Sequence, residues 1–190
     1  QSLCSKVMLL SDGKIIHIGE VNTAIKRYLT INEKKKNLDL KNRSDRKGNG
    51  LLKFTKVTYE EKKGCILRQV QSGQDINIKI SFYLKRQIEK VIFRLIVVDS
   101  LGKVIFVCNN FHSSDYFHKL PSSKEVTCFI PSLPLPEGNY YLNLHAYSRE
   151  EGLLDEIDTA AELLVENGDF FGTGKVPNIK EGVYIKHNWY

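Results

Sequence analysis

The hydrophobic pattern of the chain changes once, near Gly50. Beyond this residue, apolar and polar positions alternate in short runs separated by turn residues, which is typical of half-buried β-strands. Ahead of it, a short hairpin pattern gives way to apolar residues that recur every three or four positions. The pattern predicts a β domain over residues 50–190 and a separate N-terminal element over residues 1–31.

About eight short strands are expected, with no convincing helix between them. They cover residues 52–59, 75–85, 91–98, 104–108, 126–130, 140–147, 160–165 and 183–186, and the first has one slip in its alternation. Strands without crossover helices cannot build a parallel sheet, so we predict an all-β antiparallel sandwich. Tyr140 follows a turn at the head of its strand. Its hydroxyl either bonds back to the loop, as in a tyrosine corner, or the ring is a plain core aromatic.

In the N-terminal element, apolar runs at 7–10 and 15–18 flank Asp12-Gly13, which predicts a hairpin. An apolar stripe then predicts a helix that starts between residues 20 and 22. Its members are Val21, Ala24, Ile25, Tyr28 and Leu29. Residues 32–49 show no period and are interpreted as a basic linker.

The net charge of +6 comes from the front of the chain. Residues 1–90 hold 20 Lys and Arg against 9 Asp and Glu, whereas residues 91–190 hold 8 against 13. The densest basic segment, 33–47, contains no aromatic residue, so we expect a solvated linker and no nucleic-acid partner. Attraction of this segment to anionic lipid head groups is a second hypothesis.

The sequence contains no apolar run of about 18 residues that could span a bilayer. Residues 1–10 lack the features of a signal peptide and are interpreted as an internal point of a longer protein. The four cysteines form no CxxC pair and no His/Cys cluster, so no zinc site is expected. Cys108 and Cys128 lie in apolar runs and are interpreted as buried thiols of a reducing compartment, in preference to a disulfide framework.

No catalytic constellation is evident. None of the five histidines lies in a nucleophile motif, and the spacing of His112, Asp115 and His118 fits no metal site. The Gly-Thr-Gly-Lys segment at 172–175 lacks most of a phosphate loop. The crowded carboxylates are interpreted as a solvated turn, in preference to a glycosidase pair. They are Asp155, Glu156, Asp158 and Glu162. We therefore expect no catalytic residue, no metal and no cofactor.

The strand from Tyr140 offers a candidate carbohydrate site on the face that alternation turns away from the core. This face carries Tyr141, Asn143, His145 and Tyr147, and then Arg149. Aromatic rings can cover the apolar face of a pyranose, while amide, imidazole and guanidinium groups bond to its hydroxyls. An ordinary outward face, or one covered by a dimer partner, is the alternative.

Residues 3–29 resemble the tail of an ABC-transporter ATPase domain. They contain a cysteine, an apolar strand, Gly13-Lys14-Ile15, a further glycine and a segment ending Tyr28-Leu29. Ser5 replaces the usual Asp, and Glu20 stands where a capping Asp is common. The fragment has no phosphate loop, signature motif or switch histidine. The resemblance therefore implies that ATP and Mg belong to an absent upstream part of a parent that hydrolyses ATP.

From Gly50 onward the chain is similar to the C-terminal carbohydrate-binding domain of Wzt-type polysaccharide exporters. The shared marks are Leu-Pro-Leu-Pro-Glu-Gly-Asn-Tyr at 133–140, the acidic stretch 155–165, Asp-Phe-Phe-Gly-Thr-Gly-Lys at 169–175, Gly182, and His-Asn-Trp at 187–189. The resemblance implies an Ig-like sandwich that is non-catalytic and recognises the exported glycan, often O-antigen.

The same resemblance implies a homodimer that exchanges the C-terminal strand, which here begins at Val183 and ends at Trp189. The long connection before it could reach a partner. It further implies a permease partner and a cytoplasmic location, peripheral to the inner face of the bacterial cytoplasmic membrane. A dimerisation or docking module without a sugar site is the alternative function.

Overall fold

The computed structural model describes residues 6–11, 13–21, 23–24, 28, 40–114, 116–179 and 182–189. The chain divides into two units, 1–38 and 39–190, which we describe separately. In the first unit, β1 (Val7–Ser11) pairs antiparallel with β2 (Lys14–Gly19), so the predicted hairpin is confirmed. Most of the predicted helix after Glu20 lies outside the described residues. Within the described ranges, no helix has the length and apolar character needed to cross a bilayer.

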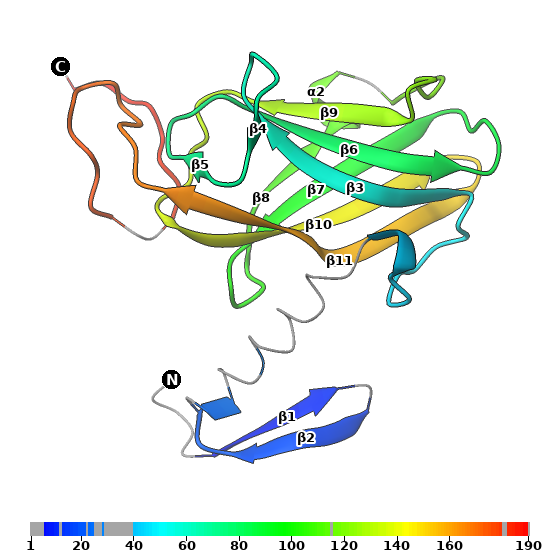
Figure 1. Ribbon diagram of the computed structural model, residues 1–190, viewed down its shortest axis with the longest axis horizontal. Coiled ribbons are helices and arrows are strands. Elements are labelled where there is room, and N and C mark those ends of the chain that lie inside the picture. Colours follow the sequence, from blue (N-terminus) through cyan, green and yellow to red (C-terminus); the bar gives the residue numbers. More distant parts are fainter. Residues whose placement is uncertain are drawn as a thin grey trace. The chain divides into compact units, whose positions relative to one another are not determined.

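The second unit is a β-sandwich of two sheets (Figure 1). One sheet has the order β5-β11-β10-β7-β8 and the other β4-β3-β6-β9. The strands are β3 (Leu52–Glu60), β4 (Ile66–Leu67), β5 (Val70–Gln71), β6 (Ile76–Leu84), β7 (Val91–Val98), β8 (Val104–Asn109), β9 (Glu125–Ile130), β10 (Gly138–Ser148) and β11 (Gly152–Glu166). All pairs are antiparallel except the short β5–β11 pair, so the predicted all-β sandwich is confirmed.

The period of two places one face of each sheet in a single core. On β6, Ile76, Ile78 and Ile80 are buried while the residues between them are partly exposed. They join Leu142 and Leu144 of β10, from the other sheet, in one cluster. Burying each such side chain contributes about 1.5–3 kcal/mol. The slip expected in the first strand is a β-bulge between Phe54 and Lys56.

The turn that leads into β10 is held by Tyr140. Its buried hydroxyl donates a hydrogen bond to the Pro136 carbonyl oxygen at 3.1 Å. The predicted bond from this tyrosine back to its loop is therefore confirmed. Because the bond satisfies a buried hydroxyl, it also fixes the point at which the chain enters the strand of the candidate site.

The described part of the predicted basic linker packs on the sandwich. A short 3₁₀ helix, η1 (Leu40–Asn42), buries Leu40, and the Arg43 guanidinium, also buried, donates to the Asp158 and Thr159 carbonyl oxygens. Residues 40–49 are therefore not the solvated tether that we expected, because their side chains pair with groups of β11. Residues 32–39 lie outside the described residues.

Other elements differ from expectation near the edges of the sheets. Strand β11 begins earlier than predicted, at Gly152, and α2 (Asn110–Ser113) occupies part of an expected loop. The strand predicted at 183–186 is absent. That segment has no regular secondary structure and touches the β9–β10 connection through Tyr184 N–H, which donates to the Pro134 carbonyl oxygen at 2.8 Å. Trp189 beyond it is 91% exposed.

Candidate functional site

A polar row crosses the outer face of the five-stranded sheet. Asn109 of β8 lies opposite Arg94 of β7, and Arg94 lies opposite His145 of β10. His145 in turn lies opposite Glu156 of β11. Directly opposed residues of antiparallel strands point to the same face. Four strands thus align two cationic or titratable groups, an amide and a carboxylate in one line.

Lys47 closes one end of this row. Its Nζ donates to Glu156 Oε1 at 2.7 Å, and this bond lowers the pKa of the Glu156 carboxyl, with a smaller contribution from His145. The carboxylate is therefore charged and fixed in place. Neighbouring strands lie about 4.8 Å apart, so polar groups recur across the row at a spacing similar to the width of one pyranose ring.

An apolar row runs beside the polar one. Tyr147 lies opposite Ile92 on one side and Leu153 on the other. These three residues line a hollow of about 240 Å³, and its remaining lining residues belong to the polar row: Arg94, Asn109 and His145. The Tyr147 side chain is 47% exposed. The structure therefore brings an accessible ring next to hydrogen-bonding groups, and it unites the predicted residues His145 and Tyr147.

The other three predicted site residues do not join this hollow. Tyr141 is only 9% exposed and packs with Ile96 and Val98, so its ring is not the accessible stacking surface that we expected. Asn143 Oδ1 accepts a hydrogen bond from Thr159 N–H at 2.8 Å, so its amide oxygen joins β10 to an irregular part of β11. Arg149 is exposed in the turn after β10.

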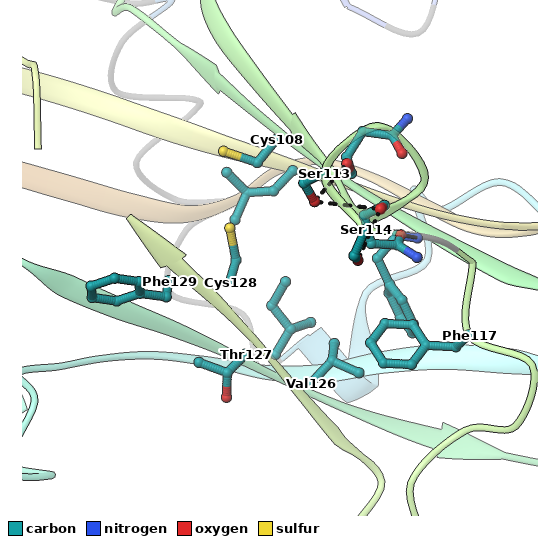
Figure 2. A pocket seen from close by; sticks show the side chains of 13 residues that line it. Cys108, Ser113, Ser114, Phe117, Val126, Thr127, Cys128 and Phe129 are labelled. Carbon is teal, nitrogen blue, oxygen red and sulfur yellow. Dashed lines mark hydrogen bonds between the residues drawn. The ribbon is translucent and has the colours of Figure 1, made fainter. Parts of the chain in front are cut away.

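A cleft opens at the edge of the sandwich between β8, α2 and β9 (Figure 2). It encloses about 200 Å³, and its labelled walls carry thiol, hydroxyl and aromatic side chains: Cys108, Ser113, Ser114, Phe117, Val126, Thr127, Cys128 and Phe129. A second hollow of about 550 Å³ shares several of these residues and extends to Arg94 and Asn109. The cleft is therefore continuous with the polar row.

Sequence reasoning missed Arg94 and Asn109. The available signal was an arginine within the otherwise apolar run 91–98. Phe93 and Leu95 are buried on either side of Arg94, which is exposed. A charged residue at the centre of an apolar strand must face away from the core, so this position marks the outer surface of the sheet.

The carboxylates of β11 do not form a catalytic pair. Asp155 is buried, where its Oδ2 accepts hydrogen bonds from Arg46 at 3.0 Å and from Phe54 N–H at 2.8 Å. Burial raises the pKa of Asp155, although these bonds oppose the shift. Glu156 lies on the opposite face. The acidic cluster is thus part of a strand, not the solvated turn that we expected. No group of His, Cys, Asp and Glu among the described residues could hold a metal ion.

The Gly-Thr-Gly-Lys segment is an internally satisfied loop. The Asp169 carboxylate accepts hydrogen bonds from Gly172 N–H at 2.9 Å, Thr173 N–H at 3.1 Å and Gly174 N–H at 2.6 Å. These bonds, that of Gly174 first, lower the pKa of Asp169. Because the side chain of Asp169 already occupies the amides, the loop does not present them to a phosphate.

Comparison with known proteins identifies the family to which the sandwich belongs. The family model of the Wzt C-terminal domain matches residues 43–176. The chain belongs to the Wzt C-terminal domain family. The crystal structure of the C-terminal domain of Wzt superposes with a TM-score of 0.60 at 14% identity, over 78% of this chain and 89% of that one. At this identity the likeness establishes a shared fold.

A β-glucuronidase from Parabacteroides merdae is also similar at 14% identity, over 62% of this chain and 14% of the enzyme. Its TM-score of 0.38 is too low to indicate a shared fold. No curated protein sequence matches the chain. Membership of the Wzt C-terminal domain family supports a role in an ABC transporter polysaccharide system, with a permease partner and a cytoplasmic location. The Wzt C-terminal domain is non-catalytic.

Proposed function

We propose that this Wzt C-terminal domain binds the polysaccharide that its transporter exports, and that the ligand lies on the outer face of the five-stranded sheet. The observation that carries the proposal is the row of Asn109, Arg94 and His145 beside the exposed ring of Tyr147. Sugar recognition requires both features in one place, because a pyranose has an apolar face and a rim of hydroxyls.

The chemistry of each group assigns it a part in binding. The Tyr147 ring covers the apolar face of a sugar ring. Arg94 donates to hydroxyl or carboxylate oxygens, and the Asn109 amide nitrogen donates, since its Oδ1 already accepts a hydrogen bond from Phe111 N–H at 2.9 Å. Each contact on this open face is weak and wet, so we expect a dissociation constant on the order of micromolar or weaker, with several sugar units contributing.

The C-terminal segment supports a homodimer by strand exchange as part of the same proposal. Within 182–189, Ile185 and Trp189 are exposed apolar side chains on a segment without regular secondary structure. Segment 183–189 would then complete a sheet of a second copy. Two copies on one transporter raise the effective concentration of sites along one polymer. The same exposed segment favours the second candidate function, a docking module without a sugar site.

Further parts of the proposal follow from the parent protein. ATP and Mg would bind an upstream ATPase part, and the domain itself would use no cofactor. It would hold the polymer at the inner face of the bacterial cytoplasmic membrane, near the permease. Of the basic segment, Arg43, Arg46 and Lys47 are paired with acidic groups in this structure, which argues against these three as a lipid anchor.

Titration of the isotopically labelled chain with the native cell-envelope polysaccharide, followed by NMR, tests the proposal. We expect shifts to concentrate at residues 92–94, 107–109 and 145–147. Arg94→Ala should weaken binding about tenfold or more, because a hydrogen bond to a charged group contributes about 1.5–3 kcal/mol. The matched control is Arg68→Ala, an exposed arginine between β4 and β5, which should bind like the wild type. Absence of shifts at millimolar polysaccharide would favour the docking module.

A further inference from the structure

Two thiols face each other where the sandwich is open. Cys108 lies on β8, the edge strand of one sheet, and Cys128 lies on β9, the edge strand of the other. Both are half-buried, free, and line both hollows of the edge cleft. Figure 2 shows both side chains on the walls of the cleft, and their mutual interaction shifts the pKa values of the two thiols in opposite directions.

The pair is chemically asymmetric. The hydrogen bond between the two thiols lowers the pKa of Cys108 and raises that of Cys128, and burial raises it further. A thiol with a lower pKa has more of the reactive thiolate. Cys65 provides a contrast. It is exposed, but its hydrogen bond to Glu61 raises its pKa. Of the three cysteines in the described part of the chain, Cys108 is therefore the one whose pKa is lowered.

We propose that Cys108 and Cys128 form a reversible disulfide that joins the two sheets at the open edge of the sandwich when the chain meets a low-molecular-weight disulfide. The Cys108 thiolate attacks one sulfur of that disulfide and expels the first small thiolate. Cys128 then loses its proton and attacks Cys108 Sγ, which expels the second. The protein dithiol is oxidised, and the small disulfide is reduced to two thiols.

The bond would link segments that backbone pairing leaves unconnected, since β8 and β9 belong to different sheets. It closes a loop of about twenty residues and restricts the unfolded chain accordingly. For a domain of this size, the melting temperature should rise by roughly 7–13 °C. In a reducing compartment the free dithiol is the resting form. This proposal does not depend on where, or whether, a glycan binds.

The test uses the full chain with Cys4→Ser and Cys65→Ser, so that only the pair remains. After incubation with oxidised glutathione, we expect the intact mass to fall by two hydrogens, titratable thiols to disappear and the melting temperature to rise, all reversed by dithiothreitol. In the otherwise unsubstituted chain, non-reducing tryptic digestion should join peptide 104–119 to peptide 125–149. This second measurement does not rely on the double variant folding.

Single variants in the same background separate the two roles. With Cys128→Ser, Cys108 should accumulate a stable glutathione adduct. With Cys108→Ser, Cys128 should react much more slowly. The proposal fails if the pair ends as a glutathione adduct without internal closure, stays unmodified, or forms disulfides between chains. It also fails if the internal disulfide appears without any rise in melting temperature, because the bond would then not join the native sheets.

Discussion

Two tyrosines on the same side of β10 should respond to substitution in opposite ways. Tyr141 is 9% exposed and packs with Ile96 and Val98, whereas Tyr147 is 47% exposed beside the polar row. Tyr141→Ala removes a buried ring from a small cluster, so the free energy of unfolding should fall by about 3 kcal/mol. Because Tyr147→Ala leaves little cavity, the free energy of unfolding should change by less than about 1 kcal/mol.

For glycan binding, the order of the two effects should be reversed, with Tyr147→Ala causing the larger loss. Loss of the Tyr147 ring removes a stacking contact of about 1 kcal/mol, which corresponds to roughly fivefold in the dissociation constant. Tyr141→Ala should retain near-normal affinity at temperatures where the variant is folded. Urea denaturation measures the free energy of unfolding, and NMR titration with the native polysaccharide measures the dissociation constant. Tyr83→Ala is the matched control, since Tyr83 is 51% exposed on the other sheet and should change neither quantity appreciably.

Either of two results would refute this reasoning. If Tyr141→Ala abolished binding without a loss of stability, its ring would be an accessible contact and the burial argument would be wrong. If Tyr147→Ala and Tyr83→Ala bound the polysaccharide equally well, the hollow beside Tyr147 would not be the site, although the outer face elsewhere could still bind sugar.

Three further outcomes are expected. Arg46→Met should lower the free energy of unfolding by about 3–5 kcal/mol, because it leaves the Asp155 carboxylate buried without its partner. Part of the lost stability should return as pH falls, because burial raises the pKa of Asp155 and protonation removes the buried charge. Urea denaturation at several pH values measures both effects. If the Arg46–Asp155 pair were solvated, neither the loss of stability nor its recovery at low pH would be seen. Asp169→Ala should accelerate hydrogen exchange at residues 172–174 with little change in melting temperature. Acidification through the lowered pKa of Asp169 should likewise reduce the protection of these amides relative to their unstructured exchange rates at the same pH, and unchanged protection would contradict its role as the acceptor. Deletion of 183–190 should yield monomers or aggregates in sedimentation, whereas a well-behaved dimer would exclude strand exchange through this segment.

Local pattern was sufficient for the long central strands, though not for the start of β11 or for residues 183–186, because a period of two reports which side of each strand is buried. It located β6 and β7 within a residue or two, and it identified the Tyr140 hydrogen bond from a turn and a strand start. It was not sufficient for Tyr141. Alternation shows that a side chain points away from the core, but not whether neighbours on the next strand, here Ile96 and Val98, cover it.

Features that depend on residues distant in the sequence could not be predicted from local pattern. The segment 40–49 has the composition of a linker, and only the fold reveals that Arg46 and Lys47 meet Asp155 and Glu156 more than 100 positions later. The polar row likewise depends on residues that are distant in the sequence. Its members come from four strands, so the pairing register that aligns them is a property of the assembled sheet and not of any one strand.

The shape of this surface has a consequence for the kind of ligand that it suits. Three strand spacings of about 4.8 Å separate Asn109 from Glu156, so the row extends roughly 14 Å across an open face. A single sugar ring can reach only part of that distance and would form few of the available contacts. A repeating polymer can satisfy the whole row at once and can rebind at the next repeat after each dissociation. Affinity should therefore grow with ligand length until the row is spanned. Beyond that length it should rise only with the number of equivalent positions, which is the behaviour that the proposed function requires.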